Sequence, residues 1–209
     1  MSHFSVAVFT RDDDNVESLL EPFNECIQPG SEYSEFIEDD DCEYDETAGK
    51  HGYWTNPEAK WDWYEIGGRW QGSLTLKDGT TSDTAAVENC VFKRDKKAYR
   101  KALRFWEVYV EHSPLNDGES MNDFDAWYKP EYYIEQYKNK ETYADYVSMF
   151  MTYAFLTPEG EWFETGQMGW FGMDDATAES RSDYKTAFRN YLEKAKDEDM
   201  TITIVDCHI

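Results

Sequence analysis

The chain has 209 residues, 17% of them aromatic, and a mean hydropathy of −0.82. Aromatic side chains in that amount can form a core, which excludes a chain disordered throughout. The formal net charge is −24, and because a field of that sign repels polyanions, we expect neither direct nucleic-acid binding nor membrane binding.

The first element expected is a buried strand at residues 4–9, where apolar side chains fill both faces. An amphipathic pattern at 15–26 predicts a helix that Pro22 kinks. Residues 28–50 are polar and acidic, and we interpret them as a loop or short helix. Residues 69–76 then favour a strand.

Asp-Gly within residues 77–80 is a hairpin turn signal, so a return strand is expected within 85–92. A helix follows at 94–112, and its first half is basic. Residues 113–130 are typical of a long loop, with one helical turn around 124–127.

The last third of the chain alternates helices and strands. The elements expected are a helix at 131–149, a hairpin with strands at 152–156 and 161–164, a Gly-aromatic loop at 166–172, a helix at 177–196 and a strand at 201–209. Together these patterns predict one α+β domain over residues 1–209. Its sheet is mainly antiparallel and contains the N- and C-terminal strands, with three to four helices packed around it.

The four Cys show no paired spacing, which favours free thiols in a reducing compartment and argues against zinc. No leader-like segment follows Met1, and no window supplies the ~20 apolar residues of a membrane span. We therefore expect a cytoplasmic protein without a metal or cofactor.

An aromatic block at residues 56–70 surrounds two adjacent glycines and an arginine. Its rings could stack on a flat ligand while the guanidinium holds a phosphate or carboxylate. The candidate ligand-binding residues are Trp61, Asp62, Trp63, Tyr64, Gly67, Gly68, Arg69 and Trp70. The alternative is a rigid corner in which Arg69 pairs with Asp62 and the rings fill the core.

Asp206 and His208 alternate onto one side of the last strand, and His3 lies near the start of the first. If the two strands pair, the three come together, and a carboxylate that orients an imidazole is half of a general-base arrangement. They are the catalytic candidates. Such groups can also ligate metals, and an ordinary strand end is the remaining alternative.

Residues 11–47 hold fifteen Asp or Glu and a single Arg, more than half of the net charge. The run lacks the central Gly of a Ca²⁺ loop. The carboxylates proposed to bind a partner are Asp39, Asp40, Asp41, Glu43, Asp45 and Glu46. The basic helix at 94–112 could neutralise this segment within the fold. A homodimer contact or a phosphate site is the alternative role of that helix.

Several segments make the chain resemble a known family. They are Met1–Phe4, Asn56-Pro57, Lys60–Tyr64, Ile66–Trp70, Leu156–Trp162, Met168–Gly172 and Ile204–Ile209. They resemble a family of tailed-phage and prophage proteins for which no reaction or catalytic residues are established. The resemblance implies an origin in an infected bacterial host rather than an activity.

The first functional hypothesis is that a phage protein binds and inhibits a host protein of an antiviral defence. Its carboxylates would take the place of nucleic-acid phosphates on a basic surface. The second is a small-molecule or nucleotide-binding protein that uses the aromatic block. The third is a hydrolase with an Asp/His site at the C-terminal strand.

Overall fold

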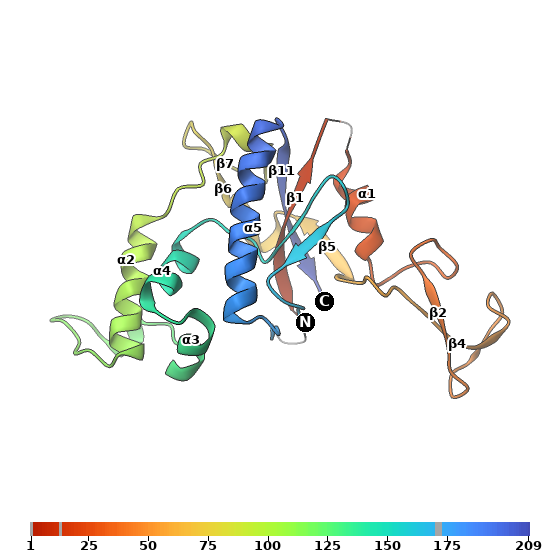
Figure 1. Ribbon diagram of the computed structural model, residues 1–209, viewed down its shortest axis with the longest axis horizontal. Helices are drawn as coiled ribbons and strands as arrows, with labels where there is room; N and C mark the ends of the chain where they lie inside the picture. Colours follow the sequence, from red (N-terminus) through yellow and green to blue (C-terminus); the bar gives the residue numbers. More distant parts are fainter. Residues whose placement is uncertain (1, 13, 170–172) are drawn as a thin grey trace.

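The computed structural model describes residues 2–12, 14–169 and 173–209. Its main sheet has six strands (Figure 1). In order across the sheet, the strands are β10 (Trp162–Glu164), β9 (Ala154–Leu156), β1 (His3–Thr10), β11 (Thr201–His208) and β5 (Trp63–Ile66), with β8 (Thr84–Ala86) also pairing with β11. The β1–β9 pair is parallel and the other pairs are antiparallel. The predicted α+β fold is confirmed.

The first and last strands of the chain are neighbours at the centre of this sheet. Their register runs from His3 opposite His208 to Thr10 opposite Thr201. Both strands are buried along almost their whole length, which explains why apolar residues occupy both faces in the sequence. The two chain ends therefore lie side by side (Figure 1).

Helix α5 (Ala178–Asp197) covers one face of the sheet (Figure 1). Its Phe188 and Leu192 share a core cluster with Phe9 and Ile202. A capping box at its start, in which the Thr177 and Ser180 side chains accept from each other's backbone amides, satisfies amides that the helix leaves free.

The opposite face of the sheet has its own core cluster, which includes Val6, Val8, Leu20 and Trp61. Helix α1 (Val16–Leu20) and a 3₁₀ turn (Glu21–Phe23) carry Leu20 to this face. The helix expected over 15–26 is thus shorter, and the Pro at the start of the 3₁₀ turn explains why.

A third cluster, rich in tyrosines, joins three helices on the other side of α5. They are α2 (Lys96–Phe105), which continues as a π-helical turn (Trp106–Val110), α3 (Pro130–Tyr137) and α4 (Lys140–Ser148). The single helix expected at 131–149 is two helices. Lys138 has a φ of 67°, and the Asn139 side chain caps α4 by accepting from the Thr142 amide.

Residues 28–50, expected as a loop or short helix, are turns and loops joined by short strands. This segment contributes β2 (Glu35–Glu38), β3 (Tyr44–Asp45) and the start of β4 (Lys50–Thr55) to a three-stranded antiparallel sheet of order β2-β4-β3. The ring of Phe36 packs edge-on against Trp54, 5.3 Å between centroids. We call residues 28–55 the acidic lobe, and they project from the main sheet (Figure 1).

Residues 69–76 do not form one strand. Gly68–Trp70 is a 3₁₀ turn, and only β6 (Leu74–Thr75) is extended, paired with β7 (Thr81–Ser82). The strand that pairs with β6 therefore comes earlier than 85–92, and within 85–92 the expected pairing is limited to an isolated antiparallel bridge between Leu76 and Cys90. The helical turn expected near 124–127 lies at Met121–Asp123. Of the Gly-aromatic loop, residues 170–172 lie outside the described residues.

Candidate functional sites

The acidic lobe exposes most of its carboxylates to water. It holds nine Asp or Glu and one Lys. Its one ion pair among the described residues joins Lys50 to Glu38. Of the six carboxylates proposed for partner binding, four have exposed side chains with no bonding partner in the described part of the chain: Asp40, Asp41, Glu43 and Glu46.

The remaining two, Asp39 and Asp45, stabilise turns within the lobe. The Asp39 carboxylate accepts from the Asp41 amide at 3.0 Å, and that of Asp45 from the Ala48 amide at 2.8 Å. The bond from Ala48 holds the pKa of Asp45 below its usual value. The lobe also carries exposed aromatic side chains, Tyr44 (57%) and Tyr53 (49%).

The basic first half of α2 does not neutralise this lobe. Arg94, just before α2, pairs with Asp145 of α4, and Arg104, in the last turn of α2, pairs with Glu119 at 2.6 Å and Glu107 at 3.4 Å. Helix α2 and the lobe lie at opposite ends of the molecule (Figure 1). The interpretation in which residues 11–47 cancel against this helix therefore does not hold for the described residues.

The exposed side of α2 forms a cationic groove of about 630 Å³. Its lining residues are Lys93, Arg94, Lys96, Tyr99 and Arg100. The guanidinium of Arg94 also lies 4.4 Å over the Tyr99 ring. This groove is the part of the surface that suits the homodimer contact or the phosphate site considered for the basic helix.

The aromatic block does not form one pocket. Trp61 is buried in the core, donating from Nε1 to the Leu20 carbonyl at 3.2 Å, and Tyr64 packs on the same face of the sheet. Trp63 lies on the other face, 49% exposed. Arg69 is exposed and its side chain has no partner among the described residues, so it does not pair with Asp62.

The two glycines of the block permit a close approach to two carboxylates. Gly67 and Gly68 have φ of 74° and 49°, conformations that favour glycine. A Cβ on Gly67 would lie 2.6 Å from the Asp83 carboxylate, and one on Gly68 would lie 2.5 Å from Asp206 Oδ2. Both positions thus depend on glycine for space as well as for conformation.

The catalytic candidates come together where β1, β11 and β5 meet. His3 Nδ1 lies 2.8 Å from Asp206 Oδ1, and His208 Nδ1 lies 2.6 Å from Asp62 Oδ1. The Arg69 amide donates to Asp206 Oδ2 at 2.9 Å, so both oxygens of this buried carboxylate are held. The expected proximity of His3, Asp206 and His208 is present, and Asp62 joins them.

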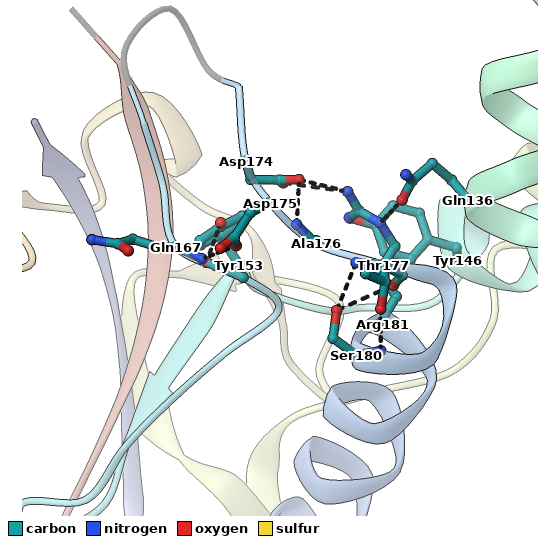
Figure 2. A network of polar contacts seen from close by, with 11 residues as sticks. Gln136, Tyr146, Tyr153, Gln167, Asp174, Asp175, Ala176, Thr177, Ser180 and Arg181 are labelled. Atoms are coloured by element: carbon teal, nitrogen blue, oxygen red, sulfur yellow. Dashed lines mark hydrogen bonds and ion pairs between the residues drawn. The ribbon is translucent and has the colours of Figure 1, made fainter.

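A pocket of about 210 Å³ opens beside His3. Its other lining residues are Phe4, Ser5, Trp70, Tyr146, Met151, Thr152, Tyr153 and Met168. Beyond it lies a polar network at the start of α5 (Figure 2). There the Arg181 guanidinium donates to Asp174 Oδ1 at 3.0 Å, to Gln136 Oε1 at 3.0 Å and to the Tyr146 hydroxyl at 3.4 Å. These bonds hold one wall of the pocket.

Within the described residues, no group of three or more His, Cys, Asp or Glu side chains is placed to hold a metal ion. In the same part of the chain, no helix is long and apolar enough to cross a membrane. The metal-ligating alternative for His3, Asp206 and His208 therefore has no support in this geometry.

No family model, no curated protein and no solved structure matches this chain. The sites are thus defined by their geometry alone. The sequence predicted that His3, Asp206 and His208 come together, but it suggested Arg69 as the partner of Asp62. It did not find the Arg181 network, because Gln136, Tyr146 and Asp174 are far apart in the chain and form no local pattern.

Proposed function

We propose that this protein binds a basic surface of another protein through its acidic lobe, at a place that otherwise holds nucleic acid, and thereby inhibits that protein. The observation that carries the proposal is the exposure of Asp40, Asp41, Glu43 and Glu46 on a projecting lobe, without partners among the described residues. The protein's own basic helix lies at the far end (Figure 1).

The chemistry is that of a charge mimic. Carboxylates in the turns of the lobe replace phosphates in ion pairs with Lys and Arg, which steers association and makes it dependent on salt. The exposed rings of Tyr44 and Tyr53 add the kind of contact that contributes most at protein interfaces. Asn56 fixes the base of the lobe by donating to the carbonyls of Pro22 and Asn24.

The resemblance to phage and prophage proteins suggests the partner. A phage protein meets the cytoplasm of its bacterial host, where proteins that handle nucleic acid present basic surfaces. A host protein that takes part in antiviral defence is therefore the partner that we propose.

The test is capture from bacterial lysate with three forms of the immobilised protein. The first is wild type, and the second has Asp40, Asp41, Glu43 and Glu46 changed to Asn or Gln. The third is a control with the same change of charge elsewhere, at Glu88, Asp117, Glu135 and Glu193, all exposed. We expect wild type and control to retain the same protein at about 0.1 M salt and to lose it near 1 M, where screening is much stronger.

Competition with DNA tests whether the lobe occupies a nucleic-acid site. Duplex DNA added to the loaded resin should release the captured protein, since both compete for one basic surface. The lobe variant should retain at least 10-fold less, which corresponds to about 1.4 kcal/mol. Equal retention by the lobe variant, or retention that DNA does not reduce, would contradict the proposal.

A second candidate function is binding of a small planar ligand. The pocket beside His3 favours it, because Trp70, Tyr146 and Tyr153 line a volume of about 210 Å³. Thermal shift against a panel of nucleotides checks this function, and binding should raise the melting temperature. Substitution of Trp70 by Leu should remove the shift; a flat response to every compound would exclude it.

A further inference from the structure

Two Asp–His pairs lie side by side at one end of the central strands. Asp206 orients His3 and Asp62 orients His208, each through Nδ1. This leaves both Nε2 atoms without a partner among the described residues, while the two side chains keep 15% and 13% of their surface exposed. A carboxylate on one ring nitrogen that leaves the other for chemistry is the usual arrangement of a catalytic imidazole.

The two imidazoles are also neighbours. His3 and His208 are opposite each other in the β1–β11 register, with ring centroids 4.9 Å apart and planes at 77°. Trp63 is the cross-strand neighbour of His208 on β5, and its half-exposed ring lies 6.4 Å from His3. His3 on β1, His208 on β11 and Trp63 on β5 are therefore neighbours across three adjacent strands.

We propose that His3 and His208 are the general base and general acid of a catalytic site that hydrolyses a small phosphodiester carrying a planar base. His3 Nε2 takes a proton from water as the water oxygen bonds to phosphorus. The bond from phosphorus to the leaving oxygen breaks, and protonated His208 gives its Nε2 proton to that oxygen. The products are a phosphomonoester and an alcohol, and solvent returns the proton from His3 to His208.

We assign the nucleophile to water because, among the described residues of the two central strands, neither Ser5 nor Cys207 is free to attack. The Ser5 hydroxyl is buried and accepts a hydrogen bond from the Tyr153 amide at 3.2 Å. Cys207 points to the opposite face, and burial raises the pKa of its thiol far above the usual value. The nucleophile is then water or a hydroxyl of the substrate, and in hydrolysis it is water.

The substrate class follows from charge and size. A chain with a net charge of −24 repels long polyanions, which favours a small ester over RNA or DNA as the substrate. The backbone amide of Arg69 donates to Asp206, so this exposed residue begins beside the site, and its guanidinium, which has no partner among the described residues, can supply a cation for one phosphate. The face of Trp63 can stack on a base. The pocket of about 210 Å³ beside His3 has room for only part of such a molecule.

Asp206 and Asp62 are positioning residues in this scheme, since each holds a ring rather than the substrate. Asp206 is the more strongly held, by His3 Nδ1 and the Arg69 amide. Asp62 is more exposed, so it can be replaced with less risk to the fold. Asp62→Asn should therefore lower kcat and alter its pH profile while leaving KM close to that of wild type.

The test uses the full chain with two probes, bis(p-nitrophenyl) phosphate and a cyclic adenosine monophosphate, followed by absorbance and phosphorus NMR. We expect turnover of at least one probe with a bell-shaped pH profile. His3→Gln and His208→Gln should each lower kcat by about 100-fold or more. Arg69→Ala should raise KM. His51→Gln is the matched control, because His51 lies in the acidic lobe, and it should retain full activity.

Circular dichroism and thermal melts establish that each variant is folded. If a His variant is not folded, the kcat of Asp62→Asn tests the proposal instead. The proposal is overturned if neither probe is turned over above the buffer rate, or if folded His3→Gln and His208→Gln keep the wild-type kcat. The site is independent of the acidic lobe: the lobe variant should hydrolyse the probes normally, so the two proposals fail separately.

Discussion

Gly68 lies directly against the carboxylate of Asp206. A Cβ at this glycine would come within 2.5 Å of Asp206 Oδ2. The same carboxylate accepts from the Arg69 amide and contacts His3 Nδ1. A turn between β5 and β6 therefore controls the position of a buried acid on β11 and, through it, an imidazole on β1.

Gly68→Ala should destabilise the protein strongly. The substitution adds the cost of a left-handed conformation, about 1–2 kcal/mol, to overpacking of about 1–3 kcal/mol against Asp206. Urea unfolding followed by fluorescence measures the loss, which we expect to be near 3 kcal/mol from those two sources.

Gly79→Ala is the matched control for this variant. Gly79 also has a positive φ, 86°, but no heavy atom lies within 4 Å of the position of its Cβ. It should lose only the conformational part, about 1 kcal/mol. Equal losses in the two variants would show that the contact with Asp206 contributes nothing.

Elements with regular patterns and few competing signals could be predicted from the sequence. The alternation in β11 and the apolar stripe of α5 predicted which faces are buried. The expected pairing of β1 with β11 is present in the sheet. Placing His3 beside His208 followed from that pairing alone. The exact register, which puts the two directly opposite, required the complete sheet.

Other features could not be predicted, for physical reasons. The strands of the acidic lobe are short, and Phe36 stands in a strand that begins and ends with Glu, so the sequence showed no apolar alternation there. Asp62 was assigned to Arg69 because the two are close in sequence. Its real partner, His208, lies on a strand that tertiary pairing brings alongside.

The ion pair between Arg104 and Glu119 should make stability depend on pH below the neutral range. The Arg104 guanidinium, followed by the Asn116 amide, lowers the pKa of Glu119 to about 2 from its usual 4.5. A carboxyl whose folded pKa is depressed contributes stability above its unfolded pKa. That contribution is lost as the pH falls from 4.5 towards 2.

Glu119→Gln checks this dependence. The variant should melt below wild type at neutral pH, and the difference in Tm should shrink as the pH falls through that window. Asp117→Asn is a suitable control because Asp117 is exposed in the same loop and bonds to none of the described residues. A difference in Tm that stays constant down to pH 2 would contradict the assignment.

The four thiols should differ widely in reactivity. Cys26 is exposed, whereas Cys90 and Cys207 are buried, and burial raises the pKa of both buried thiols. Cys42 is intermediate in exposure, and partial burial, together with nearby Asp39, raises its pKa. Iodoacetamide followed by mass spectrometry should label Cys26 first.

Labelling of Cys207 in the native protein should require global unfolding, because β11 lies between β1 and β5. Its rate should therefore rise with urea in parallel with the unfolding transition. Rapid labelling of Cys207 without denaturant would mean that the last strand detaches, which would also separate His208 from His3.

Arg181 connects α5 to α3 and to the segment before α5 through a nearly buried ion pair (Figure 2). Its side chain is 8% exposed and that of Asp174 is 15% exposed. Arg181→Ala leaves the Asp174 carboxylate without its cation, which should cost about 3–5 kcal/mol. Replacing both charges, as in Arg181→Met with Asp174→Asn, leaves no unpaired ion, so much of the loss should be recovered. Asn at position 174 still offers an oxygen to the Ala176 amide. Urea unfolding measures the free energy of unfolding of the single and the double variant. If the double variant is no more stable than Arg181→Ala, the loss comes from packing around the arginine stem and not from the unpaired carboxylate.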